Sequence, residues 1–192
     1  MGAAALISGL EVAAALLAAH RPADPTEAEA LALARRLAAA GAWRRTDAAP
    51  GHLTASALVL SPDRERVLLI EHRAFGAWIQ PGGHLDGPAE GPPESPLATA
   101  LRELAEEAGV VDVEPLYDGL LDVERYAVAP RPARGEPAHL HLDLRFALRA
   151  RAWELRAGSD AKAARWCPRS MEGDPKLDQG VARGLARLRA RG

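Results

Sequence analysis

The sequence predicts an α+β domain that follows a helical extension. Alanine- and leucine-rich helical segments fill about the first 40 residues, whereas β-type runs begin near residue 53. One strongly amphipathic helix, residues 96–108, lies among these runs, and a mixture of strands and helices in this order is typical of the α+β class. We therefore expect two parts, an N-terminal helical extension over residues 1–47 and a core domain over residues 48–192.

Two helices are predicted in the extension. The first runs from about residue 6 to residue 19, where leucines gather on one side and a proline then ends the pattern. The second spans residues 25–40, because Asp24 can cap it, Pro25 suits its first turn and Gly41 can close it. We expect these helices to pack on the core or to mediate formation of a homodimer.

Short runs of Val, Leu and Ile predict the strands of the core domain. They cover residues 53–60, 66–72, 110–113, 119–128, 139–149 and 164–167. The helix over 96–108 has clear boundaries, since Ser95 can cap it, Pro96 suits its first turn and Gly109 can close it in the left-handed conformation. A last amphipathic helix is predicted over about 177–189.

Composition and charge exclude several classes of function. The 24 Lys and Arg residues against 26 Asp and Glu residues give a net charge of -2, which does not favour binding to nucleic acid or to an anionic membrane. Cys167 is the only cysteine, so the chain forms neither an intramolecular disulfide nor a cysteine-built zinc site. The apolar run over 12–19 is too short to span a bilayer. We expect a cytoplasmic protein that acts on a small molecule.

Three carboxylates crowd one side of the predicted helix over 96–108. Helical spacing separates Glu103, Glu106 and Glu107 from the leucine stripe that faces the core. Like charges one turn apart repel each other by about 0.2–0.5 kcal/mol per pair, and a divalent cation that prefers hard oxygen ligands relieves this repulsion. Mg²⁺ or Mn²⁺ is the natural candidate for such a site, but three glutamates alone are more typical of a solvated acidic face without a metal.

The residues around these carboxylates resemble a known motif. Residues 102–110 read R-E-L-A-E-E-A-G-V, similar to the C-terminal half of the Nudix box, G-x5-E-x7-R-E-U-x-E-E-x-G-U, in which U is aliphatic. Glu94 stands at the required gap before Arg102, and Gly82 and Gly83 resemble the turn that opens the motif.

The box departs from the family pattern at one point. Ten residues instead of five separate Gly83 from Glu94, which we interpret as a five-residue insertion within residues 86–93. Extra length in a Gly- and Pro-rich loop costs little closure entropy. If the loop returns to the start of the helix, the Gly83 carbonyl remains a metal ligand, as the family's glycine is.

The resemblance implies a Nudix-type α/β/α sandwich with a mixed β-sheet. It also implies a pyrophosphohydrolase that uses Mg²⁺ or Mn²⁺ to cleave a diphosphate linkage in a nucleotide or a nucleoside diphosphate derivative. The implied metal ligands are Glu103, Glu106, Glu107 and Gly83, the catalytic residues are Glu103, Glu106 and Arg102, and the structural residues of the motif are Gly82, Glu94 and Gly109. Glu103 is a candidate base, although family members also use carboxylates outside the box, and Arg102 is expected to orient the glutamates.

A second polar cluster is predicted on a strand. Residues 139–146 alternate strictly, so His139, His141, Asp143 and Arg145 share one face. This face is either solvated or lines the cleft, with Asp143 as a further metal ligand or base and Arg145 as a phosphate contact. Two histidines and an aspartate also suit zinc, yet histidines two residues apart are common on polar strand faces.

Further candidates lie before and after the double glycine that resembles the start of the box. Arg73 and His84 are predicted to approach the diphosphate, and His52 and His72 are weaker candidates. Tyr126 either stacks on a base of the substrate or belongs to the core. The predicted substrate-binding residues are thus Arg73, His84, Asp143 and Arg145.

Two other functions remain open. A catalytically weak Nudix-fold module that binds a nucleotide or regulates another process is the main alternative, and it predicts the loss of a box glutamate, whereas none is lost. An isopentenyl-diphosphate isomerase shares the fold but relies on a catalytic cysteine near the start of the core, where this sequence has none.

Overall fold

The computed structural model describes residues 8–44, 50–73, 76–87, 91–132, 135–158, 161–173 and 177–191. The helices are α1 (Gly9–Ala19), α2 (Pro25–Ala40), α3 (Pro96–Ala108) and α4 (Gln179–Arg191), with a short 3-10 helix, η2, at Arg169–Gly173. The strands are β1 (Gly51–Leu60), β2 (Arg66–His72), β3 (Trp78–Ile79), β4 (Gly82–His84), β5 (Val113–Pro115), β6 (Asp122–Val128), β7 (His139–Ala150) and β8 (Ala161–Pro168). Within these ranges no helix is both long enough and apolar enough to cross a membrane.

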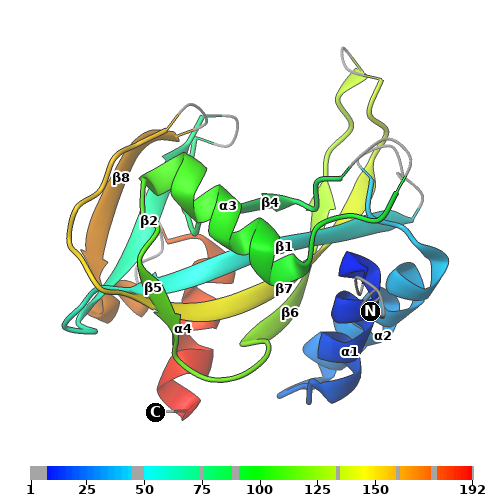
Figure 1. The fold of residues 1–192 in the computed structure, drawn as a ribbon, viewed down its shortest axis with the longest axis horizontal. Helices are drawn as coiled ribbons and strands as arrows, with labels where there is room; N and C mark the ends of the chain where they lie inside the picture. Colours follow the sequence, from blue (N-terminus) through cyan, green and yellow to red (C-terminus); the bar gives the residue numbers. More distant parts are fainter. Residues whose placement is uncertain are drawn as a thin grey trace, which may run out of the picture.

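One mixed sheet of eight strands forms the centre of the molecule (Figure 1). Its main path runs β3-β2-β1-β7-β5, while β4 pairs with β1, β6 with β7 and β8 with β2. The strands β1 and β7 are parallel along the whole of β1, and the other described pairings are antiparallel. Because β1 has neighbours at both edges and helices over both faces, it is buried throughout.

Helices cover both faces of the sheet (Figure 1), which confirms the predicted α+β class and its sandwich arrangement. Leu104 of α3 packs in one apolar cluster with Leu53 of β1. Leu185 of α4 packs in a second cluster with Leu58 of β1 and with Cys167, which is therefore a core residue as expected. The alternation of side chains along β1 thus supplies both layers of the core.

The helical extension joins the same core as α3. Leu17 of α1 and Leu31 of α2 belong to the apolar cluster that contains Leu104. Ser8 caps α1 with Glu11 in a reciprocal capping box, and Asp24 caps α2 by accepting the Glu27 N–H. Residues 6 and 7 of the first predicted helix lie outside the described residues.

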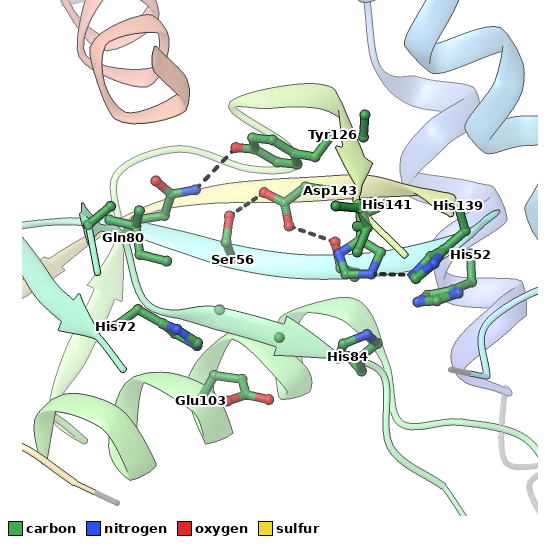
Figure 2. Close-up of a pocket in the computed structure, with 18 of the residues that line it drawn as sticks. His52, Ser56, His72, Gln80, His84, Glu103, Tyr126, His139, His141 and Asp143 are labelled. Atoms are coloured by element: carbon green, nitrogen blue, oxygen red, sulfur yellow. Dashed lines mark hydrogen bonds between the residues drawn. The ribbon is translucent and has the colours of Figure 1, made fainter. Parts of the chain in front are cut away.

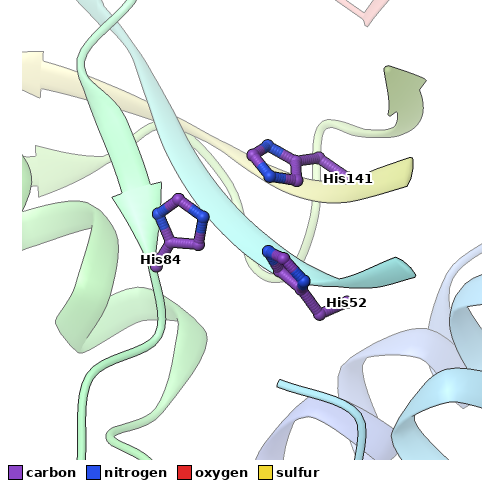
Figure 3. A group of neighbouring side chains, drawn as sticks. All are labelled: His52, His84 and His141. Carbon is purple, nitrogen blue, oxygen red and sulfur yellow. The ribbon is translucent and has the colours of Figure 1, made fainter. Parts of the chain in front are cut away.

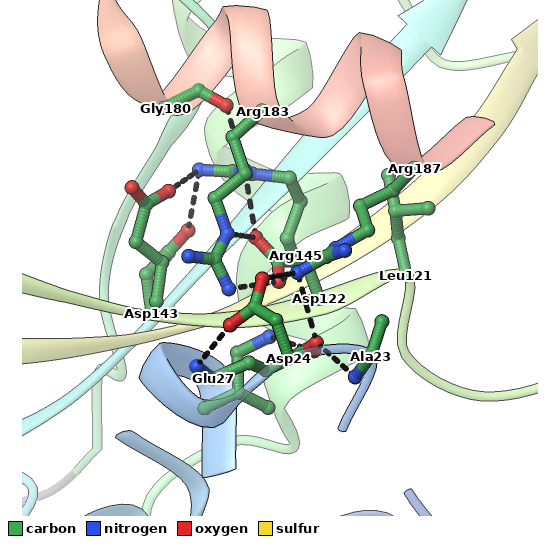
Figure 4. A network of polar contacts seen from close by, with 12 residues as sticks. Ala23, Asp24, Glu27, Leu121, Asp122, Asp143, Arg145, Gly180, Arg183 and Arg187 are labelled. Carbon is green, nitrogen blue, oxygen red and sulfur yellow. Dashed lines mark hydrogen bonds and ion pairs between the residues drawn. The ribbon is translucent and has the colours of Figure 1, made fainter. Parts of the chain in front are cut away.

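A buried ion network joins β6, β7 and α4 (Figure 4). Arg145 of β7 is completely buried and donates to Asp122 (3.3 Å), Glu124 (2.7 Å) and the Gly180 carbonyl (2.8 Å). Arg183 of α4 donates to both carboxylate oxygens of Asp122, at 2.8 and 2.9 Å. Charge pairs that are buried and hydrogen-bonded in this way hold the packing of these elements in one arrangement.

The same network reaches the helical extension. Arg187 of α4 contacts Asp24 and Glu27 of the extension, and the Glu27 carboxylate also accepts the Val123 N–H of β6 at 3.2 Å. Burial raises the pKa of Glu27, but hydrogen bonds from His20 and from the Ala23 N–H outweigh it and lower that pKa. The ionised Glu27 therefore fixes α2 against the sheet.

Gly109 ends α3 in the left-handed region, with φ of +71°. A Cβ there would lie 3.0 Å from the Arg156 Cβ, whereas Gly119, with φ of +82°, has open space around it. We expect Gly119→Ala to cost about 1 kcal/mol of unfolding free energy from backbone strain, and Gly109→Ala to cost about 1 kcal/mol more. Urea unfolding of both variants tests this, and equal losses would show that the Arg156 contact has no effect.

Candidate active site

A cavity of about 910 Å³ lies over the neighbouring strands β4, β1 and β7 (Figure 2). Glu103 and Glu107 of α3 contribute carboxylates to its lining. Polar side chains of β1 and β7, among them Ser56 and Asp143, line another part of it. Figure 2 shows Glu103 and Asp143 on opposite sides of β4, so acidic groups approach the cavity from two layers of the fold.

The two α3 carboxylates lie against the backbone of β4. Glu107 is buried, and its Oε2 accepts the Gly82 N–H at 3.0 Å. A Cβ on Gly83 would lie only 2.2 Å from the Glu103 Oε1, so a side chain at this position would displace the Glu103 carboxylate. Burial raises the pKa of Glu103, against the lowering effect of Arg102. The double glycine thus allows two acidic side chains to lie close against one short strand.

Arg102 connects the parts of the box. Its guanidinium donates to the Glu94 Oε1 from Nε (3.0 Å) and Nη2 (2.7 Å), and to the His84 carbonyl at 3.0 Å. Its Nη1 donates to Glu103 at 2.9 Å and to Glu106 at 3.2 Å. These contacts are those of an orienting residue, because one side chain fixes β4, the start of α3 and two of its glutamates together.

The long box loop closes on itself before α3 begins. The Glu94 N–H donates to the Asp86 carbonyl at 2.7 Å, and the Asp86 N–H donates to the Glu94 Oε1 at 3.2 Å. Burial alone raises the pKa of Glu94, but hydrogen bonds from Arg102 and the Asp86 N–H outweigh it and lower that pKa. Asp86 and Glu94, the two ends of the loop, are thus joined by hydrogen bonds; residues 88–90 between them lie outside the described part of the chain.

Asp143 reaches the cavity from β7. Its carboxylate accepts the hydroxyl of Thr54 at 3.1 Å and that of Ser56 at 2.5 Å, both from β1. Burial raises the pKa of Asp143 above its usual range. Arg73 and His84, the other predicted substrate contacts on this side, also line the cavity.

Two residues of the predicted site do not line the cavity. Arg145 does not line the cavity, because its guanidinium is fully buried in the ion network, so its predicted role as a phosphate contact is wrong for this arrangement. Glu106 is not among the lining residues either: its side chain is 56% exposed and pairs with Arg102. Tyr126 lines the cavity, but its hydroxyl is held by Glu124 and Arg145, which restricts its ring.

Sequence analysis missed Thr54 and Ser56 and named His52 only as a weaker candidate. These three residues of β1 occupy alternate positions and all line the cavity, although the strand was predicted from its apolar residues. Their spacing of two was visible in the sequence and could have indicated a shared face. Gln80 was also missed, since a single residue in a loop gives no periodic pattern.

Comparison with known proteins identifies the family of the chain. A sequence model described as the NUDIX domain matches residues 50–188, and the chain therefore belongs to the Nudix family. The match begins after α2, so it leaves the two N-terminal helices outside.

A curated relative matches about half of the chain. A probable DHNTP pyrophosphohydrolase from Lactococcus lactis subsp. cremoris is 34% identical over 96 residues, which cover 50% of this chain and 52% of the relative. The chain thus spans about half the length of that relative.

Solved structures share the fold. The Escherichia coli dihydroneopterin triphosphate pyrophosphohydrolase matches with a TM-score of 0.57 at 13% identity, over 79% of this chain and 99% of the other. The NUDIX domain of Shewanella oneidensis NrtR, solved with ADP ribose, matches with a TM-score of 0.52 at 22% identity, over 72% of this chain and 86% of the other. At these identities the likeness supports the fold alone.

Proposed function

We propose that this Nudix-family chain is a metal-dependent pyrophosphohydrolase that cleaves a diphosphate linkage in a nucleotide or a nucleoside diphosphate derivative. The observation that carries the proposal is the arrangement of Glu103 and Glu107 against the Gly82 and Gly83 backbone, with Arg102 fixing the surrounding elements. The name of the Lactococcus lactis relative, a probable pyrophosphohydrolase, supports the same class of reaction.

The donor set fits a hard divalent cation. Carboxylate and carbonyl oxygens are the ligands that Mg²⁺ and Mn²⁺ prefer, and the glycine at position 83 leaves room that a side chain would fill. We assign the ion to Glu103, Glu107 and the Gly83 carbonyl, and also to Glu106, whose exposed side chain would have to leave Arg102 and turn toward the cavity. When bound, it would neutralise diphosphate oxygens and lower the pKa of a coordinated water.

The remaining roles follow from the environment of each side chain. Glu103 is the candidate base, because burial raises its pKa and so makes its carboxylate a better proton acceptor. Arg102 acts as a positioning residue through its bonds to Glu94 and Glu103. Arg73 and His84 line the cavity where an anionic substrate would lie, and they are the proposed substrate contacts.

A binding or regulatory module is the second candidate. The observation that favours it is the long loop between Asp86 and Glu94, since ten residues separate Gly83 from Glu94 where the family pattern has five. The NUDIX domain of Shewanella oneidensis NrtR, which shares this fold, was solved with the nucleotide ADP ribose bound. This candidate predicts nucleotide binding without turnover.

The test is product release from a panel of substrates. Phosphate would be measured, with a coupled phosphatase where needed, from nucleoside diphosphate derivatives, nucleotides, ADP ribose and dihydroneopterin triphosphate. We expect turnover with Mg²⁺ or Mn²⁺, loss of turnover with a chelator, and recovery when the ion is returned. Nucleotide binding without turnover under every condition would favour the binding module instead.

A further inference from the structure

Three histidines from three adjacent strands meet in the cavity (Figure 3). His52 of β1 lies opposite His141 of β7 in the parallel register. His84 of β4 lies opposite Thr54, which is two residues along β1 from His52 and therefore on the same face. The pairing of β4, β1 and β7 thus brings together three imidazoles that are distant in the sequence.

The spacing of these imidazoles suits one metal ion. One nitrogen from each ring lies within 4.8 Å of the other two, so all three lie within about 2.8 Å of a common point. Zinc–imidazole bonds are about 2.0–2.1 Å long, and each nitrogen would therefore move inward by less than about 1 Å on binding. His52 is completely buried, while His84 and His141 are partly exposed, which leaves one side of the site open to the cavity.

A fourth histidine holds one of these rings in place. His139 Nδ1 lies 2.8 Å from the Pro137 carbonyl, which only accepts, so this nitrogen carries a proton. The Nε2 of a neutral His139 then has a lone pair, and it lies 3.1 Å from the Nε2 of His141. Two lone pairs at this distance repel each other, so the His141 Nε2 carries a proton and donates it to His139, which leaves the His141 Nδ1 as the atom that can bind a metal. A hydrogen bond of this kind orients the ring, as outer-shell acceptors do in metal sites.

We propose that His52, His84 and His141 form a binding site for a transition-metal ion of the zinc type, held in position by His139. Imidazole ligands suit zinc, copper, iron and nickel, whereas the carboxylates of the box suit magnesium and manganese. The cavity would then hold two kinds of ion, each on its own donor set. This proposal rests on the histidine geometry and does not depend on the proposed hydrolytic activity.

Zinc binding to the full chain tests the site. Protein freed of metal would be titrated with Zn²⁺ against a chromogenic chelator, in excess Mg²⁺ so that the carboxylates are occupied. We expect one zinc ion per chain, and a roughly 100-fold or larger loss of affinity in His84→Asn and in His141→Asn. Cobalt in place of zinc is expected to give visible absorption bands typical of nitrogen ligation, which the two variants lose.

Matched controls distinguish zinc bound at the three histidines from zinc bound elsewhere on the chain. His72→Asn removes another histidine of the same cavity that does not belong to the cluster, and its zinc affinity is expected to match that of the parent chain. Circular dichroism would confirm that the variants fold. The proposal is wrong if no zinc binds at micromolar concentration, if both histidine variants bind it unchanged, or if Glu107→Gln alone removes the binding.

Discussion

Replacing Glu107 by glutamine is expected to lower the turnover of a cleavable diphosphate substrate by roughly 100-fold or more. Glutamine has nearly the same shape, and its carbonyl oxygen can still accept the Gly82 N–H that Glu107 accepts at 3.0 Å. The fold should therefore persist while one negative charge leaves the proposed metal site. Steady-state kinetics at several Mg²⁺ concentrations would separate a loss of turnover from a weaker affinity for the ion.

Two further variants make this measurement specific. Glu103→Gln is expected to reduce turnover at least as strongly, since Glu103 shares the cavity and is the candidate base. Glu154→Gln removes an equal charge from an exposed position outside the cavity and should leave turnover unchanged. Normal turnover in both Glu103→Gln and Glu107→Gln would contradict the metal assignment.

Replacing Arg145 by methionine is expected to lower the free energy of unfolding by about 3–5 kcal/mol. The substitution leaves the buried carboxylate of Asp122 with fewer partners and removes the 2.7 Å contact with Glu124. For a chain of this size the loss corresponds to a fall in melting temperature of roughly 6–20 °C. Arg145→Lys keeps the charge without the planar fork, and its loss should lie between the parent and the methionine variant.

A surface arginine provides the matched control. Arg151 is more than half exposed and pairs with Glu114 at 3.1 Å, so Arg151→Met should change stability by no more than about 1 kcal/mol. Thermal unfolding of the three variants side by side would test the comparison. Equal effects at Arg145 and Arg151 would show that burial of the ion network contributes nothing to stability.

Local patterns predicted the elements with caps or periodicity. Residues 96–108 form α3 with the expected boundaries, because Ser95, Pro96 and Gly109 mark both ends. The alternation from His139 onward also correctly placed His139 and His141 on one face, where their rings touch. By contrast, the strand expected over 110–113 begins only at Val113, since apolar residues after a helix can pack without entering a sheet.

Contacts between segments that are distant in the sequence could not be predicted from local patterns. The three-residue strand β4 lies in a Gly- and Pro-rich stretch that was interpreted as loop, and its pairing with β1 is what moves His84 beside His52. Alternation placed Arg145 on the cavity face but gave no information on Asp122 and Glu124, which surround it from β6. The burial of a charged residue depends on partners that the fold brings from elsewhere.

The closure between Asp86 and Glu94 has a consequence for how such a loop can change. Because the two ends are joined by their own hydrogen bonds, the number of residues between them is uncoupled from the position of Glu94 and of the helix that follows. Residues can therefore be gained or lost between these two ends while Glu94 and α3 keep their places.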